Sequence, residues 1–109
     1  MAKGKNFSGT WKAVRKDSFG RTAKVIIKKK VIQVYWIKGN SKYLYWYGSW
    51  NPKKKNGKYV AKSKNNHKKT GFSLYASGDK YKKFTFKNGV ISFSSSMRGI
   101  TDKISVKKK

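Results

Sequence analysis

The chain has 109 residues, of which 29 are Lys or Arg and three are Asp; it has no Glu, and its formal net charge is +26. This length indicates one domain. The absence of Cys excludes disulfides, thiolate chemistry and Cys-ligated metal. Folding brings the like charges together, so we expect a polyanionic partner to offset their repulsion.

High charge is typical of disordered chains. Here, however, aromatic residues make up 16% of the chain, and they fall with the β-branched residues in periodic runs. Each buried aromatic side chain removes roughly 150–250 Å² from water. We therefore expect a single folded β-barrel domain at residues 7–107, with a flexible basic N-terminus at 1–6 and a basic tail at 108–109.

Runs of Val, Ile, Thr and aromatic residues recur about every ten residues between turn signals, which predicts strands throughout and little or no helix. In chain order we expect strands at 10–15, 21–28, 31–38, 42–50, 58–64, 72–77, 81–87, 90–95 and 100–107. The pair Asn88-Gly89 suits a tight hairpin because both residues tolerate positive φ. Pro52 opens a loop at 52–57, and a second polar loop spans 64–70.

Eight or nine antiparallel strands favour an all-β fold, a small up-and-down meander closed into a barrel, because closure removes exposed sheet edges. A two-sheet sandwich is the alternative. Alternation along the strands assigns the side chains that face inward. The expected core comprises Trp11, Val14, Val25, Ile27, Val34, Trp36, Leu44, Trp46, Phe84, Phe86, Ile91, Phe93, Ile104 and Val106.

Catalytic groups are scarce. His67 is the only His and lies in a polar loop, where we interpret it as a solvated residue. Asp17 and Asp79 lie in turn sequences, where short acidic side chains bond their own backbone. We expect no enzymatic activity, no metal and no cofactor.

The segment 42–50 is unusual because aromatic residues occupy both of its faces. Alternation places Tyr43, Tyr45 and Tyr47 on one face and Leu44 and Trp46 on the other. In one interpretation the tyrosines form an exposed platform on which single-stranded bases stack. In the other, they pack against neighbours on adjacent strands.

Basic residues supply the remaining candidates. Lys outnumbers Arg 26 to three, and Lys acts as a mobile point charge, whereas Arg makes geometry-specific contacts. We therefore expect salt-sensitive binding by a broad surface with little base readout. The candidate residues are Lys28, Lys29, Lys30, Lys42, Lys53, Lys54, Lys55, Lys68, Lys69, Lys82, Lys83 and Arg98.

Four stretches, at 7–13, 32–36, 44–50 and 76–93, resemble a family of small β proteins from Gram-positive bacteria and their phages, many of them lipoproteins or lipocalin-like. The resemblance implies a lipocalin-like barrel, and Gly9-Thr10-Trp11 implies that Trp11 closes one end of it. Those relatives are acidic or balanced and carry a lipidated Cys. This chain departs in both respects, which argues against membrane anchoring and for a different partner.

The sequence thus predicts a monomeric, cytoplasmic, non-enzymatic protein that binds single-stranded or duplex nucleic acid. A phage or mobile-element protein that interferes with host nucleic-acid machinery, or with a nucleic-acid-bound host protein, fits this description. No apolar run reaches the ~20 residues of a membrane span. One alternative is a secreted or envelope-associated antimicrobial protein that binds teichoic acid or anionic lipid. Another is a charge-engineered variant of a neutral β-barrel.

Overall fold

The computed structural model describes residues 7–18, 20–71, 79–97 and 99–108. The flexible segment expected at 1–6, the strand expected at 72–77 and the candidate residue Arg98 lie outside these residues. None of the helical structure within the described ranges is long and apolar enough to cross a membrane.

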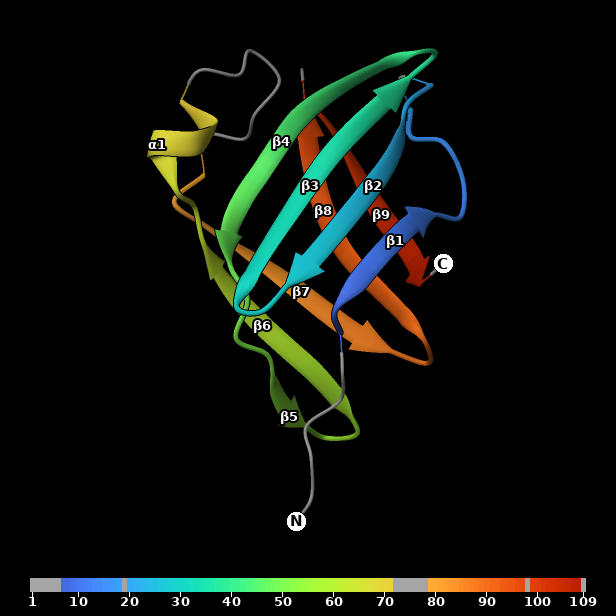
Figure 1. Ribbon diagram of the computed structural model, residues 1–109. Helices are drawn as coiled ribbons and strands as arrows, with labels where there is room; N and C mark the ends of the chain where they lie inside the picture. Colours follow the sequence, from blue (N-terminus) through green and yellow to red (C-terminus); the bar gives the residue numbers. More distant parts are fainter. Residues whose placement is uncertain (1–6, 19, 72–78, 98, 109) are drawn as a thin grey trace.

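The described residues form an all-β fold, as predicted (Figure 1). A strand at 53–55 and a short helix at 67–70 lie where only loops were expected, and the last strand extends into the expected tail to reach Lys108. In chain order these elements are β1 (Gly9–Ala13), β2 (Thr22–Lys28), β3 (Val31–Lys38), β4 (Ser41–Ser49), β5 (Lys53–Lys55), β6 (Lys58–Lys64), α1 (His67–Thr70), β7 (Tyr81–Lys87), β8 (Val90–Met97) and β9 (Ile100–Lys108).

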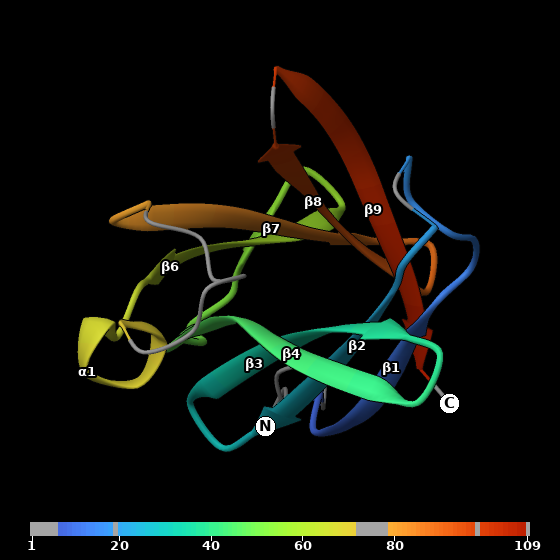
Figure 2. The same ribbon diagram turned by 90° about the horizontal axis from the view of Figure 1, so that it is seen from above.

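The strands form one antiparallel sheet in the order β4-β3-β2-β1-β9-β8-β7-β6-β5. The first and last strands pair with each other, so the free edges of the sheet, β4 and β5, come from the middle of the chain. The sheet curls into a half-barrel that brings β4 back towards β6 (Figure 2). The two strands meet through the bridge between Gly48 and Asn65, next to which the Asn66 amide donates to the Tyr47 carbonyl at 2.7 Å.

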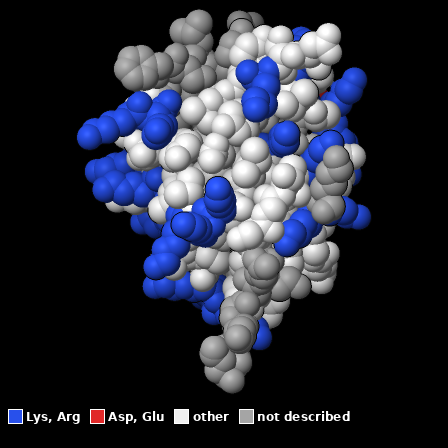
Figure 3. Space-filling model, viewed as in Figure 1, with Lys and Arg blue, Asp and Glu red and all other residues white. Residues whose placement is uncertain are grey.

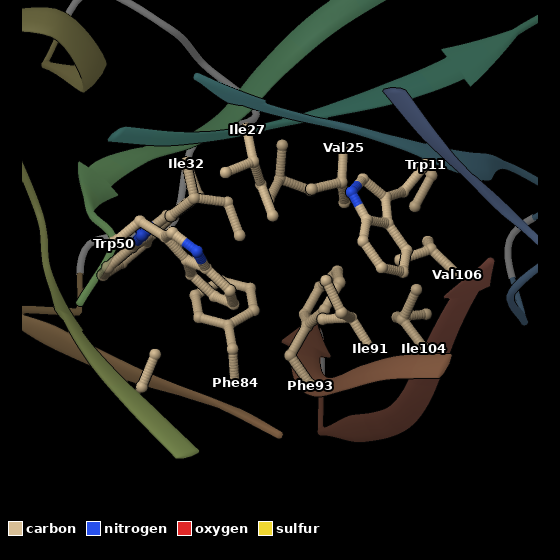
Figure 4. Close-up of a cluster of buried hydrophobic side chains, with 14 of the residues drawn as sticks. Trp11, Val25, Ile27, Ile32, Trp50, Phe84, Ile91, Phe93, Ile104 and Val106 are labelled. Carbon is tan, nitrogen blue, oxygen red and sulfur yellow. The ribbon is translucent and has the colours of Figure 1, made fainter. Parts of the chain in front are cut away.

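The core lies between the two halves of the curled sheet, where side chains from β1–β4 face those from β6–β9 (Figure 4). Of the expected core residues, all except Val14 and Leu44 are buried. Val14 is 47% exposed because β1 ends at Ala13, before the strand predicted there does. Trp11 lies in the core, where its indole Nε1 donates to the Phe7 carbonyl at 3.0 Å.

A β-bulge in β4 changes which way its side chains point. Trp46 lies opposite Val34, whereas Leu44 lies opposite Tyr35, which leaves Tyr45 as an extra residue in β4. An extra residue breaks the two-residue alternation, so Tyr45 and Trp46 are adjacent and both buried, at 6% and 0% exposure. The placement of Leu44 in the core was therefore wrong.

Close packing joins the end of β4 to the end of β6. The buried Trp46 Nε1 donates to Ser63 Oγ at 2.8 Å. A Cβ atom at Gly48 would lie 2.5 Å from both the Lys64 carbonyl oxygen and Ser63 Oγ. Glycine is therefore needed at position 48 for β4 to approach β6 this closely.

We predict that Gly48→Ala destabilises the protein by about 1–3 kcal/mol, the usual cost of overpacking a tight site. The measurement is the free energy of urea-induced unfolding. Ser41→Ala serves as the control because Ser41 is exposed at the start of the same strand. A Gly48→Ala protein as stable as the Ser41→Ala control would show that β4 and β6 are not held in this contact.

Candidate nucleic-acid interface

The three aspartates are each engaged by a neighbouring side chain. Asp17 pairs with Arg21 at 2.6 Å, and both side chains are buried. Asp17 also accepts from the Arg21 amide at 2.8 Å, which confirms its predicted role in the turn. Asp102 accepts from the Ser18 hydroxyl at 2.5 Å, and Asp79 lies 3.6 Å from the Lys82 ammonium. Within the ranges that the structure describes, the three aspartates thus form no acidic patch to balance the basic surface.

Most of the candidate lysines are on the surface, because the strand alternation and the turns direct them outward. Figure 3 shows basic side chains crowded on the side of the molecule near α1 and β6, and around a paler area over β2–β4. The exposed candidates are Lys28, Lys29, Lys30, Lys42, Lys53, Lys54, Lys55, Lys68, Lys69 and Lys83.

Lys82 is the exception, and its assignment to the surface was wrong. It is 8% exposed, and its ammonium donates to the Ser94 carbonyl at 2.9 Å. The same ammonium lies 5.2 Å from the ring centroid of Tyr45 and 5.6 Å from that of Trp46. Lys82 lies two residues before the inward-facing Phe84, so strand alternation already indicated this orientation.

The predicted platform of three exposed tyrosines on one face does not form. Tyr43 is half-buried and packs against the core. Tyr45 is buried, with its ring centroid 5.1 Å from that of Trp36 and 6.2 Å from that of Phe93. The bulge at Tyr45 separates these two side chains from Tyr47, so the packing interpretation holds for both of them.

Tyr47 instead lies on the outer face of the sheet, close to Tyr35 of β3. Gln33 lies opposite Tyr47 and accepts a hydrogen bond from the Tyr35 hydroxyl at 2.6 Å. The Lys42 ammonium lies 4.7 Å from the Tyr35 ring centroid, and the Lys69 ammonium lies 5.6 Å from that of Tyr47. Two half-buried rings thus each have an ammonium above them, an arrangement in which cation and ring attract each other. The sequence alone left open whether Tyr35 extends the predicted platform of tyrosines or is a plain barrel residue.

A hollow of about 500 Å³ lies beside Tyr47, where β3, β4, β6 and α1 meet. Asn66 helps to form it, because its side chain accepts from the Lys68 amide at 3.1 Å and caps α1. His67, expected to be solvated, is exposed in this helix. We call this site the Tyr47 hollow; its lining includes Lys30, Tyr47, Lys64, Asn66, His67 and Lys68.

The Tyr47 hollow brings together three of the predicted segments: the turn after β2, the end of β4 and the polar loop before residue 71. Other candidates lie apart from it. Lys53, Lys54 and Lys55 form β5, a short edge strand, and lysines on a sheet edge discourage pairing with another chain. No family model matches this chain, and no curated protein or solved structure matches it either.

Burial raises the pKa of the Tyr35 hydroxyl, and electrostatic repulsion from Tyr47 raises it further. We predict that Tyr47→Phe shifts the pKa of Tyr35 down towards the ordinary value near 10, because it removes one of the two causes. The pKa can be measured by NMR titration of proteins labelled at the tyrosine ring carbons. An unchanged Tyr35 pKa in the Tyr47→Phe protein would contradict the electrostatic interaction of the two tyrosines.

The sign of the accompanying stability change follows from linkage. A raised pKa in the folded state means that Tyr35 favours folding while it is protonated in both states. Its contribution is fully present below the pKa of the unfolded chain and is lost as the pH rises from there through the folded-state pKa. Tyr35→Phe is the control, because it should remove this part of the alkaline loss of stability.

Proposed function

We propose that this protein is a non-enzymatic nucleic-acid-binding protein that holds a single strand with little sequence specificity. The Tyr47 hollow carries the proposal, because it places an accessible aromatic ring among lysines from three segments of the chain. Base stacking on aromatic rings beside a basic groove is a general way to bind single strands.

The charge distribution supports the same function. The described surface has basic side chains on both halves of the sheet, while the aspartates are engaged by Arg21, Lys82 and Ser18. Such a positively charged surface attracts phosphates, and binding of its cations to the phosphates releases the counterions that surround them. Binding should therefore be strong at low salt and weaken steeply as salt is added.

Weak sequence specificity follows from the kind of cation present. The basic side chains lining the Tyr47 hollow are Lys30, Lys64 and Lys68, with no Arg among the described lining residues. Lys neutralises phosphate without the planar, bidentate geometry that reads a base edge. Contacts to phosphates position a strand but carry no direct sequence information.

We predict that Tyr47→Ala weakens binding of a fluorescent oligothymidylate roughly 5- to 150-fold, the range expected for loss of one base–ring stack. Tyr47→Phe keeps the ring and should bind nearly as the unchanged protein does. The measurement is fluorescence anisotropy at several salt concentrations. An affinity independent of salt, or equal affinities for the Ala and Phe proteins, would overturn this mode of binding.

Two double variants that remove equal charge distinguish binding at the Tyr47 hollow from attraction by the overall positive charge of the protein. Lys68→Ala with Lys69→Ala should reduce the log–log salt slope by about 0.7 for each phosphate that the protein no longer neutralises. Lys53→Ala with Lys54→Ala removes the same charge from β5 and should have less effect. Binding to phosphatidylglycerol vesicles tests the alternative function. If the protein binds these vesicles as tightly as DNA, and Tyr47→Ala has no effect, the result would indicate an envelope-associated protein instead.

A further inference from the structure

The backbone pairing between β7 and β8 covers only part of the two strands. These strands pair only where Thr85, Phe86 and Lys87 meet Val90, Ile91 and Ser92. On either side the ladders continue further, since β6 pairs with β7 up to Tyr81 and β8 pairs with β9 up to Met97. The first half of β7 and the second half of β8 therefore diverge within the sheet.

Lys82 spans the gap between the diverging strands. It belongs to β7, and its ammonium donates to the carbonyl of Ser94 in β8 at 2.9 Å. The interaction replaces part of the backbone ladder that ends at Thr85 and Ser92. An inward-facing cation is therefore held at the point where the sheet opens.

A cleft of about 550 Å³ opens along this gap. Its lining combines outward-facing side chains with Lys82 and Phe93, which belong to the inward-facing series, so the cleft reaches between the strands. Continuing the β7–β8 register would place Lys83 opposite Ser94, and on the other side Ser94 lies opposite Lys103. Cations thus occupy both walls. We call this site the β7–β8 cleft; its lysines are Lys58, Lys82, Lys83, Lys87 and Lys103.

We propose that the β7–β8 cleft is a discrete binding site for a small, multiply charged phosphate ligand such as a polyphosphate chain. Five lysines line it against one carboxylate, that of Asp79, and a ligand with several negative charges would neutralise them. Hydroxyls of Ser92, Ser94 and Ser96 lie along the same cleft and can donate to phosphate oxygens. Its volume is in the range of small-molecule sites.

The proposal of this site does not rest on the proposed binding of single strands. The β7–β8 cleft and the Tyr47 hollow share no lining residue. Their aromatic side chains also come from different strands, since Tyr81 and Phe93 of the cleft belong to β7 and β8, whereas Tyr47 belongs to β4. Phosphate groups could reach the cleft from a free phosphorylated molecule or from nucleic acid. The shared chemistry is a compact group of phosphate charges, and competition distinguishes the two sources.

The test is isothermal titration calorimetry of the full chain with inorganic tripolyphosphate at fixed ionic strength. We expect one tripolyphosphate per chain and an affinity at least tenfold lower for Lys83→Ala with Lys103→Ala. Both side chains are exposed, so the double variant should fold. The control, Lys53→Ala with Lys54→Ala, carries the same charge change outside the cleft and should alter the affinity less than twofold.

An equal loss of tripolyphosphate affinity in the two double variants, or binding of several equivalent ions per chain, would overturn the proposal. Either result would mean that the overall positive charge of the protein binds the ion. Displacement of tripolyphosphate by oligothymidylate would identify nucleic-acid phosphates as a source. Lack of displacement would identify a free phosphorylated ligand. If the control and cleft variants bind tripolyphosphate with equal affinity while Tyr47→Ala still weakens oligothymidylate binding, the proposal of the β7–β8 cleft is wrong but the proposed function stands.

Discussion

The structure depends on keeping ammonium and guanidinium groups in water. A buried cation without a partner is very costly, and a chain with 29 Lys and Arg but three Asp can supply few anionic partners. Among the described residues the two buried cations are Arg21 and Lys82, and each has partners: Arg21 pairs with Asp17, and Lys82 with the Ser94 carbonyl and Asp79. The other Lys and Arg side chains of the described ranges lie outside the core. A sheet with one face inward achieves this through alternation, and its outer face is consequently basic on both halves.

Alternation also explains how much of the fold was predictable. In β2, β7, β8 and β9 the two-residue period is unbroken. It correctly identified the buried hydrophobic residues Val25, Ile27, Phe84, Phe86, Ile91, Phe93, Ile104 and Val106. It failed in β4, because the extra residue at Tyr45 leaves no mark in a run where both faces are aromatic. β5 was missed because a Lys-Lys-Lys run has low strand propensity, and its strand structure comes from pairing with β6.

The Tyr47 hollow was predictable only in part. Lys30, Lys68 and Tyr47 were candidates individually, but nothing local to any of them indicates that they meet. They are brought together by the contact of Gly48 with Asn65. This contact lies at the ends of β4 and β6, which are separated by β5 in the chain and are not neighbours in the strand order of the sheet. The β7–β8 cleft was missed for a similar reason, since divergence of two strands joined by a tight turn depends on packing. The inward orientation of Lys82, by contrast, could have been found from its spacing to Phe84.

We propose that nucleic acid relieves the charge repulsion that folding creates. The most direct test compares the thermal unfolding midpoint at low salt with oligothymidylate and with a peptide nucleic acid of the same bases, whose backbone is uncharged. Ligands that bind the folded state more tightly than the unfolded chain raise the midpoint. We therefore expect a clear rise with oligothymidylate that added salt reduces, and little change with the uncharged analogue. An unchanged or lowered midpoint with oligothymidylate would show that nucleic acid does not stabilise the folded state.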